Sequence, residues 1–416
     1  MAKNENLHDA KQAKMDDFYT YYDTIEAEAN AYIEFNHDVF RGKTILLPCD
    51  DPEWSNFTKY FAANFERLGI KKLISTSYAP SELNRQISLF ESESPQFDEH
   101  MHREHGKVFI MDHPIIQNGE YHWHDVDWYY LKGDGDFRSE EVTHLRDESD
   151  VIITNPPFSL FREFLEWVEP DKRLFSIIGN VNAITYKEVF PLIKNNTIWL
   201  GASIHSGDRK FNVPDSYPLN AAGCGVESNG RHYIKVKGVR WYTNIDHGLR
   251  HESMPLMTMQ DNLIYNKKLR KTLMNKYGQD ENNLHYEHYD NYDAIEVSQT
   301  DAIPSDYDGV MSVPITFLDK YCPDQFEILN ANDFRKSAEV PTKSHGLIKD
   351  KEGSITLDKS EQSGNAIDRQ TDRQHSTLTE RSATVVYSYG SYDDMVARPI
   401  IHSIKTYRRI FICRKH

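Results

Sequence analysis

Short apolar runs alternate with amphipathic segments through the first 200 residues of the chain. Runs of this kind, rich in Val, Ile and Leu, are typical of strands that are buried on both faces of a sheet. The segments between them repeat apolar residues at helical spacing, as in 57–68 and 160–168. The alternation predicts an α/β domain with a doubly wound, mainly parallel sheet. Its predicted strands are 44–47, 72–76, 107–111, 151–154, 174–178 and 197–200.

Three further elements follow from the same pattern. Residues 184–193 predict a helix, and residues 232–236 and 239–243 predict a β-hairpin that turns at Lys237-Gly238. The chain is also expected to end in strands, at 384–387 and 400–412.

The periodicity weakens beyond about residue 248, and we place a domain boundary there. The α/β domain would then span 1–248, and a second region would span 249–416. Within the second region, residues 335–383 are rich in Ser, Thr, Lys, Asp and Gln and contain few large apolar side chains. Such a composition buries too little apolar surface to order a chain, so we expect a mobile insertion there.

The composition is that of a folded protein, with 39% apolar residues among 416. No apolar run is long enough to span a membrane, and the polar start lacks the apolar core of a signal peptide. The four cysteines lie far apart without a CxxC pair, which favours a reduced cytoplasm and no structural zinc. We therefore expect a cytoplasmic protein without a membrane partner.

The formal net charge of −16 is unevenly distributed. Residues 91–150 contain 16 acidic and five basic residues, whereas residues 231–276 contain ten basic and three acidic ones. The last twelve residues contain five basic residues and no acidic one. A local basic stripe can bind phosphates even on an acidic protein, although a solvated lysine face explains any one cluster equally well.

The most informative motif follows the predicted strand 151–154 and reads Asn155-Pro156-Pro157-Phe158. Two prolines stiffen the loop and remove two backbone donors. Asn155 offers a side-chain carbonyl and Pro156 a backbone carbonyl, and two acceptors held together suit an amine with two N–H donors. Phe158 could stack on the ring that carries this amine. A rigid turn without a ligand is the structural alternative.

With its flanking sequences, this motif resembles the EcoRI-type adenine-specific modification methyltransferases. The resemblance rests on DDFYT (16–20), PCDDPEWSNF (48–57), KGDGDFRS (132–139), TNPPFSLFREF (154–164), IIGNVNAITYKEVFP (177–191) and YDGVMSVPITFLDKY (307–321). It implies a Rossmann-like fold, S-adenosyl-L-methionine as the methyl donor and double-stranded DNA as the substrate. It also implies a bacterial or phage origin, a C-terminal target-recognition region and a restriction-modification role, with GAATTC as the first site to test. It implies no obligate protein partner and is compatible with a monomer.

The resemblance also assigns site residues. The catalytic set would be Asn155, Pro156, Pro157 and Phe158, acting on a flipped adenine. The cofactor would contact Phe18 and Tyr19, the loop Cys49-Asp50-Asp51, and Asp136-Phe137. Asp50 or Asp51 would bind the ribose hydroxyls, because the second strand ends without an acid. Asp136 would accept a hydrogen bond from the cofactor adenine, unless residues 134–136 form a plain acidic turn.

Candidate DNA contacts follow from the basic clusters and from one late aromatic residue. They are Trp241, Lys267, Lys268, Arg270, Lys271, Arg408 and Arg409. Structural packing explains Trp241 equally well. The histidines near 100–105 and 122–124 do not complete a ligand set, so we expect no metal site.

Two other functions remain open on the sequence. One is a methyltransferase of the same fold that acts on RNA or on protein glutamine, which Phe158 and the basic second half disfavour. The other is a catalytically silent DNA-binding protein, which the intact motif at 155–158 disfavours.

Overall fold

The computed structural model divides into two compact units. Unit 1 contains residues 1–254 and 318–325, and unit 2 contains residues 255–317 and 326–416. The first division lies near the expected boundary at 248, but the sequence pattern gives no sign that 318–325 returns to unit 1. The residues that the structure describes are 19–51, 55–79, 92–117, 120–122, 126–205, 207–213, 217, 219, 223–336, 347–349, 355–357, 400–401, 404–405 and 408–415.

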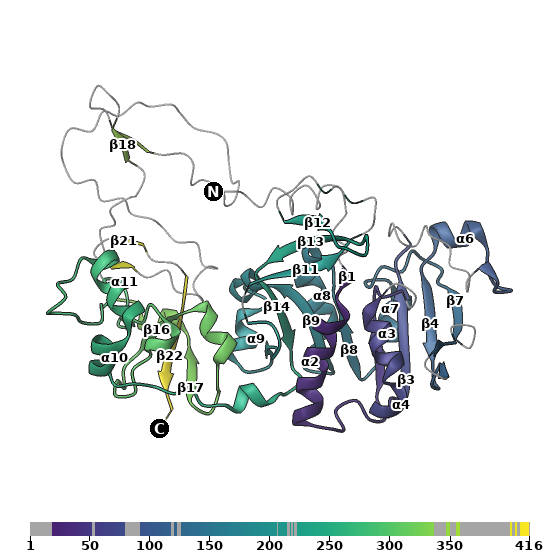
Figure 1. The fold of residues 1–416 in the computed structure, drawn as a ribbon, viewed down its shortest axis with the longest axis horizontal. Helices are drawn as coiled ribbons and strands as arrows, with labels where there is room; N and C mark the ends of the chain where they lie inside the picture. The colour runs from purple at the N-terminus through teal and green to yellow at the C-terminus, as the bar shows by residue number, and fades with distance from the viewer. Residues whose placement is uncertain are drawn as a thin grey trace. The chain divides into compact units, whose positions relative to one another are not determined.

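Unit 1 is built around a mixed eight-stranded sheet (Figure 1). Its four central strands are parallel, and the pairs toward both edges are antiparallel. The prediction of a mainly parallel sheet therefore holds for the four central strands and not for the pairs toward the edges, because an apolar run indicates burial on both faces but not the direction of a strand. In spatial order the strands are β10 (Trp199–Leu200), β14 (Val239–Thr243), β9 (Leu174–Asn180), β8 (Val151–Thr154), β2 (Thr44–Leu47), β3 (Lys72–Ser77), β4 (Lys107–Met111) and β7 (Asp127–Tyr130).

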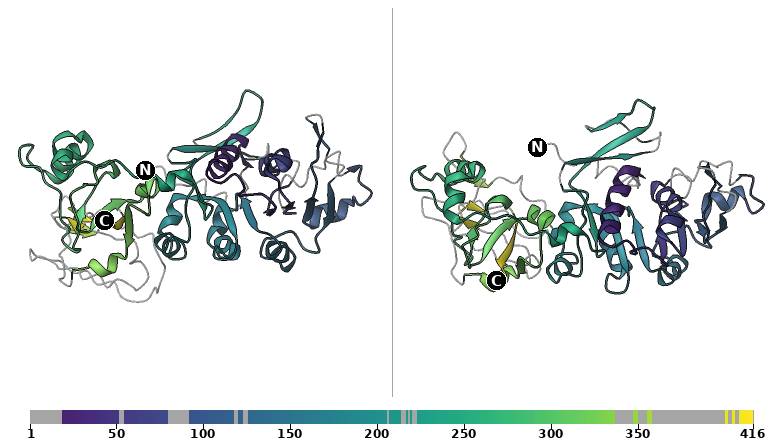
Figure 2. Two further views of the ribbon diagram at one scale, coloured as in Figure 1. Left: turned by 90° about the horizontal axis from the view of Figure 1, so that it is seen from below. Right: turned by 60° about the horizontal axis from the view of Figure 1, so that its bottom comes forward.

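Helices cover both faces of this sheet (Figure 2). On one face, Ile45 and Leu47 of β2 join a buried cluster with Tyr32 of α2 and Phe61 of α3. The opposite face is covered by α7, α8 and α9. The helices of unit 1 include α2 (Tyr22–Phe35), α3 (Asn56–Ala63), α4 (Phe65–Leu68), α6 (Glu99–Glu104), α7 (Glu140–Asp147), α8 (Phe161–Val168) and α9 (Phe190–Lys194), with the 3-10 turns η3 (Phe158–Leu160), η4 (Val181–Thr185) and η5 (Gly248–His251).

The sequence of α8 explains why this segment forms a helix with one buried face. Phe161, Phe164, Leu165 and Val168 recur at helical spacing and are all buried, while Glu163 and Glu166 face outward. Phe164 contributes further to this packing with an edge-to-face contact to Phe137, whose ring centroid lies 4.9 Å away. The helix therefore docks on the sheet directly after the Asn-Pro-Pro-Phe motif and fixes where that motif ends.

A second, antiparallel sheet of unit 1 contains β1 (Tyr19–Thr20), β11 (Asp208–Asn212), β13 (His232–Lys237) and β12 (Cys224–Val226), in that order. The predicted hairpin of 232–236 with 239–243 is wrong. β13 pairs with β11 and β12, whereas β14 pairs with β9 and β10 in the large sheet. Gly238, at φ +67°, redirects the chain between the two sheets. The burial pattern agrees, since β14 is wholly buried while β13 has exposed positions.

The predicted helix 184–193 is also wrong in part. The structure has a 3-10 turn at Val181–Thr185 and a separate helix at Phe190–Lys194. Pro191 explains the late start, because proline lacks an N–H and is tolerated only in the first turn of a helix. The short β5 (Ile116–Gln117) and β6 (Glu120–Tyr121) complete the strands described in unit 1.

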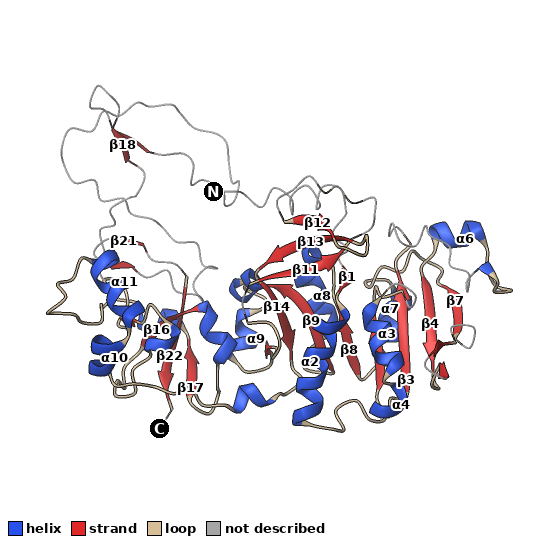
Figure 3. Cartoon of the chain, viewed as in Figure 1, coloured by secondary structure: helices blue, strands red, loops and turns tan. Residues whose placement is uncertain are grey.

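The described residues of unit 2 form a four-stranded sheet, two helices and several 3-10 turns (Figure 3). The sheet contains β15 (Ile295–Glu296), β16 (Met311–Pro314), β22 (Arg409–Arg414) and β17 (Phe326–Leu329), and the helical elements are α10 (Met259–Tyr265), α11 (Lys267–Tyr277), η6 (Thr300–Ala302) and η8 (Ala331–Phe334). Two short strand pairs are β18 (Leu347–Lys349) with β19 (Ile355–Leu357), and β20 (Ile400–Ile401) with β21 (Ile404–Lys405). The 3-10 turn η7 (Ile315–Lys320) begins in unit 2 and ends in the segment 318–325, which belongs to unit 1. Within the expected C-terminal strand 400–412, the described residues form β20, β21 and most of β22. Residues 384–387 and most of the predicted insertion at 335–383 lie outside the described residues.

A buried ion pair holds the returning segment 318–325 in unit 1. The guanidinium of Arg240 on β14 binds the carboxylate of Asp319 with two contacts, of 2.7 and 2.9 Å. Both side chains are over 90% buried. Arg240 also donates to the carbonyls of Val239 and His205. The carboxylate and the two carbonyls therefore provide hydrogen-bond acceptors for a guanidinium that is removed from water.

We predict that Asp319→Ala lowers the free energy of unfolding by about 3–5 kcal/mol, because it leaves the Arg240 charge buried without a counter-ion. Urea unfolding measures the change. Asp38→Ala is the matched control, since its pair with Arg41 is largely exposed and contributes little. Equal effects of the two substitutions would show that the buried pair does not stabilise the unit.

Candidate active site

The strand order of the large sheet reverses beside β2. The next strand along the chain, β3, lies on one side of β2, and β8 lies on the other. All three strands are parallel, so their carboxyl ends meet at one edge. This is the place where open α/β sheets bind ligands. The loop Pro48–Asp51 and the motif Asn155–Phe158 both leave the sheet here.

A buried carboxylate joins these two loops. Asp50 is 7% exposed, and its Oδ1 accepts a hydrogen bond from Ser55 Oγ at 2.6 Å. Its Oδ2 lies 2.7 Å from the hydroxyl of Thr154, the residue before Asn155. The same hydroxyl lies 2.7 Å from the carbonyl oxygen of Pro48. Asp50 therefore attaches the loop after β2 to the start of the motif.

The hydrogen-bond count explains the protonation of Asp50. The Thr154 hydroxyl has one proton and cannot serve Asp50 and Pro48 together. A protonated Asp50 can donate to Thr154, which then donates to Pro48, so every group is satisfied. Burial raises the pKa of Asp50 to about 7, against the opposing effect of hydrogen bonds from Ser55 and Thr154. The carboxyl group thus changes its charge near neutral pH.

In the loop after β2, Cys49 adopts a backbone conformation that is more common for glycine. Cys49 has φ +68°, a left-handed conformation that is uncommon for a residue with a side chain. Its amide donates to Thr76 Oγ1 at 3.2 Å, on the neighbouring strand β3. The left-handed turn at Cys49 brings Asp50 beneath the motif and Asp51 to a half-buried position at the edge.

The loop 132–139 lies against the end of β3. Gly135 has φ +88°, and a side chain there would meet the carbonyl oxygen of Ser77 at 2.2 Å, so glycine is required. The Ala79 amide donates to the Asp134 carbonyl at 2.8 Å. This loop therefore carries Asp136 to the same edge as the two other loops.

Asp136 and Phe137 have different environments. Asp136 is held by Arg138 through contacts of 2.9 and 2.6 Å, and these hydrogen bonds lower the pKa of its carboxyl. A carboxylate has further lone pairs, so the predicted contact with the cofactor adenine remains open to it. The Phe137 ring is 2% exposed and packs on Phe164 and Trp167. Its side chain is part of the core, so only its backbone is placed to reach a ligand.

The N-terminal strand reaches the motif through β11. Thr20 pairs with Phe211, and the Phe211 ring lies edge-on to Phe158 with centroids 6.3 Å apart. The Thr20 carbonyl also accepts from the Asn56 side chain at 2.7 Å. Tyr19, its neighbour, is half-buried, and Phe18 lies outside the described residues.

Sequence reasoning missed the residues that hold the site together. Thr154, Ser55 and Thr76 have ordinary hydroxyl side chains, and only the sheet order brings them to Asp50 and Cys49. One signal was available for Ser55, which precedes an apolar helical pattern and caps α3 by accepting from the Phe57 amide.

Two predicted DNA contacts are corrected by burial. Trp241 is 1% exposed and packs edge-on against Phe57 in the core of unit 1. Arg409 is 7% exposed and binds Glu296 in unit 2, with a contact of 2.6 Å. A side chain inside a core cannot reach a duplex, so both residues have packing roles instead.

The other predicted DNA contacts lie nearer the surface. Lys267, Lys268 and Lys271 are exposed on α11, and Arg408 is exposed before β22. Arg270 is half-buried and binds the Glu281 carboxylate and the Leu263 carbonyl, each at 2.8 Å.

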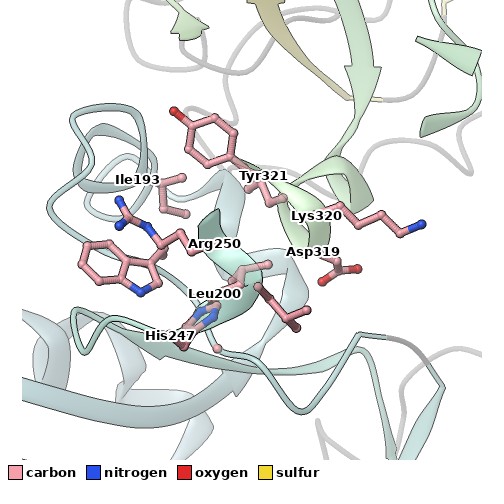
Figure 4. Close-up of a pocket in the computed structure, with 11 residues that line it drawn as sticks. Ile193, Leu200, His247, Arg250, Asp319, Lys320 and Tyr321 are labelled. Carbon is pink, nitrogen blue, oxygen red and sulfur yellow. Dashed lines mark hydrogen bonds between the residues drawn. The ribbon is translucent and has the colours of Figure 1, made fainter. Parts of the chain in front are cut away.

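A small cavity in unit 1 is a different feature (Figure 4). It is lined by Leu200, His247, Arg250 and the segment 318–321, among others, and none of the predicted catalytic or cofactor residues lines it. Its volume of about 20 Å³ is enough for a water molecule.

The described residues contain no group of three or more His, Cys, Asp or Glu side chains arranged to hold a metal ion. They also contain no helix that is both long and apolar enough to cross a membrane.

A mixed α/β sheet with the Asn-Pro-Pro-Phe loop at the edge where its strand order reverses is consistent with a methyltransferase fold. The comparisons with known proteins agree. A family described as adenine-specific methyltransferase EcoRI matches residues 6–415.

Named relatives support the same assignment. The chain is 43% identical to the type II methyltransferase M.EcoRI of Escherichia coli, over 81% of this chain and 91% of that protein. It is 30% identical to M.MpnI of Mycoplasma pneumoniae, over 83% and 93%, and 30% identical to M.MgeORF184P of Mycoplasma genitalium, over 83% and 92%. No solved structure matches. The chain belongs to the EcoRI family of adenine-specific methyltransferases, and it is an adenine-specific DNA methyltransferase.

The charge change of Asp50 predicts a pH dependence of stability. The folded pKa of about 7 lies above the ordinary 3.8, so the folded state retains a proton that the unfolded chain releases between these values. The contribution of Asp50 to the free energy of unfolding therefore falls as pH rises from about 4 to about 7. Asn, which cannot ionise, should remove this fall. We expect the free energy of unfolding of Asp50→Asn, relative to that of wild type, to rise by about 2.5–3 kcal/mol between pH 5 and pH 8, measured by urea unfolding.

The difference between the two proteins isolates this group from the other titrating residues. A difference that stays constant across the range would show that Asp50 does not change its charge there.

Proposed function

We propose that this protein transfers a methyl group from S-adenosyl-L-methionine to the N6 of an adenine flipped out of duplex DNA, as the modification enzyme of a restriction-modification system. The observation that carries the proposal is the attachment of the Asn-Pro-Pro-Phe loop, through Thr154 and Asp50, to the ligand edge of the sheet. The names of the relatives, which are type II methyltransferases, support the restriction-modification role.

The residues at this edge fit an adenosyl cofactor by their chemistry. Ribose hydroxyls and the adenine amine are donors, and Asp51 and Asp136 are half-buried carboxylates at the ends of two converging loops. Asp50 is the weaker of the two candidates for the ribose, because both of its oxygens are used inside the protein. We assign the ribose to Asp51 and the adenine to Asp136, with Tyr19 beside the methionine portion. When bound, the cofactor supplies an electrophilic methyl group.

The catalytic contribution of the motif is to bind and reshape the amine. The lone pair of N6 is delocalised into the adenine ring, which makes the amine a poor nucleophile. Hydrogen bonds from N6 to the Asn155 side-chain oxygen and to the Pro156 carbonyl favour the more tetrahedral nitrogen of the transition state. The stiff Pro156-Pro157 loop holds these acceptors without reorganisation, and Phe158 stacks on the flipped ring.

We predict that Asn155→Ala reduces methyl transfer at least about a hundredfold, because it removes an acceptor that acts in the transition state. Duplex affinity should change little. A radiolabelled methyl-transfer assay gives the rate, and gel shift gives the affinity. Asn195→Ala, at an exposed position after α9, is the matched control and should keep full activity. Near-normal transfer by Asn155→Ala would refute the assigned role.

The target site is found by expression in a host that lacks N6-adenine methylation, followed by single-molecule sequencing of its genome. We expect N6-methyladenine at one short sequence, with GAATTC tested first. Absence of the modified base from the host DNA, despite soluble protein, would refute the proposed activity.

A further inference from the structure

The exposed apolar side chains of unit 2 gather at one place. Met257, Ile264 and Tyr265 have exposed fractions of 38%, 48% and 68%, and no other large hydrophobic side chain among the described residues of this unit is exposed. They fall within nine residues, before and at the end of α10. An exposed apolar group of this kind usually marks a contact surface.

This corner between α10 and α11 is firmly held. Thr258 caps α10 by accepting from the Asp261 amide at 3.0 Å, and Asn266 caps α11 by accepting from the Leu269 amide at 3.1 Å. The buried Asn262 side chain donates to the Met257 carbonyl at 3.3 Å. Ile264 and Tyr265 are therefore presented on an ordered backbone, which lowers the entropy lost on binding.

Cationic side chains follow immediately on α11. Lys267 and Lys271 are exposed, and within the described part of the chain no carboxylate lies within 4 Å of either ammonium group. Lys268 lies 3.5 Å from Asp301 in an exposed pair, which contributes little and can exchange for a phosphate. Apolar side chains next to lysines are complementary to a groove of a DNA duplex, which has phosphates along its edges and apolar groups such as the thymine methyl among its base edges.

A buried hydrogen-bond network and two buried leucines fix the orientation of α11. Tyr277, at the end of α11, lies 3.4 Å from Glu296, which is bound by Arg409. The Leu269 and Leu273 side chains of α11 are buried on the same side as this network. The lysines are thus left on the outer face.

We propose that the corner formed by Ile264, Tyr265, Lys267 and Lys271 enters a groove of the DNA duplex and contributes to target recognition. Tyr265 and Ile264 contact bases and sugars there, while Lys267 and Lys271 pair with the flanking phosphates. This inference rests on the proposed function, since it takes the methylated duplex as the ligand. The lysines were already expected to contact DNA, and the new element is Tyr265 as an aromatic side chain that contacts bases.

The two kinds of contact give different binding signatures. Tyr265→Ala should weaken binding to a duplex with the mapped site about tenfold, and binding to a scrambled duplex much less, because base contacts carry specificity. Lys267→Ala with Lys271→Ala should weaken both duplexes alike and lower the salt dependence of binding by about one for each phosphate lost. Fluorescence anisotropy over a salt series measures both effects.

Tyr129→Ala is the matched control, because Tyr129 is 46% exposed on β7 in the acidic part of unit 1. It should leave both affinities unchanged. Tyr265→Ala that binds both duplexes like wild type would overturn the inference. A change only in self-association, measured by sedimentation, would also overturn it and would make a second copy of the chain the occupant of this surface.

Failure of the inference is distinguishable from failure of the proposed function. Wild-type protein that methylates the mapped site supports the function whatever Tyr265 does. Tyr265→Ala should raise the DNA concentration that gives half-maximal transfer about tenfold, in step with the weaker binding. An unchanged concentration would overturn a recognition role at Tyr265 while leaving the methyltransferase assignment intact.

Discussion

The site depends on one buried hydrogen-bond network, in which Asp50 connects the loop after β2 to Thr154 at the end of β8. Without it, the two loops would be separate chain segments that happen to leave the same sheet edge. With it, the position of Asn155 is set by the parallel register of β2 and β8. The motif contributes its own rigidity through two prolines, but rigidity alone does not place a loop. The carboxyl group that carries this connection is almost wholly removed from water, and its cost is offset by hydroxyl partners on both sides.

Much of the fold is visible in the sequence, because an apolar run reports burial directly. The strands that became β2, β3, β4, β8 and β9, and helices α3 and α8, all follow from that signal. Strand direction and strand pairing do not, since they depend on connections that periodicity does not encode. For this reason the antiparallel strands at both ends of the sheet, and the separation of β13 from β14 at Gly238, could not be predicted.

The part of the site that depends on consecutive residues could be predicted from the sequence. The part that depends on contacts between distant segments of the chain could not. The Asn-Pro-Pro-Phe motif carries its function in four consecutive letters. Asp50 was expected at a ligand, and its sequence neighbours give no sign that Thr154 and Ser55 contact its two carboxyl oxygens. The basic clusters also do not show which of their residues are exposed. Arg409 belongs to a basic C-terminal segment but is buried in an ion pair with Glu296, whereas Lys267 and Lys271 on α11 are exposed.

The return of residues 318–325 to unit 1 has a consequence for how such proteins can be recombined. A recognition region attached by one junction can be exchanged between relatives by a single crossover in the gene. Here the chain passes from one unit to the other at 254, 317 and 325, and Asp319 in the returning piece neutralises Arg240. An exchange that keeps unit 1 whole must therefore preserve this short interior segment. Replacing unit 2 would require several junctions, or a new sequence that retains the aspartate.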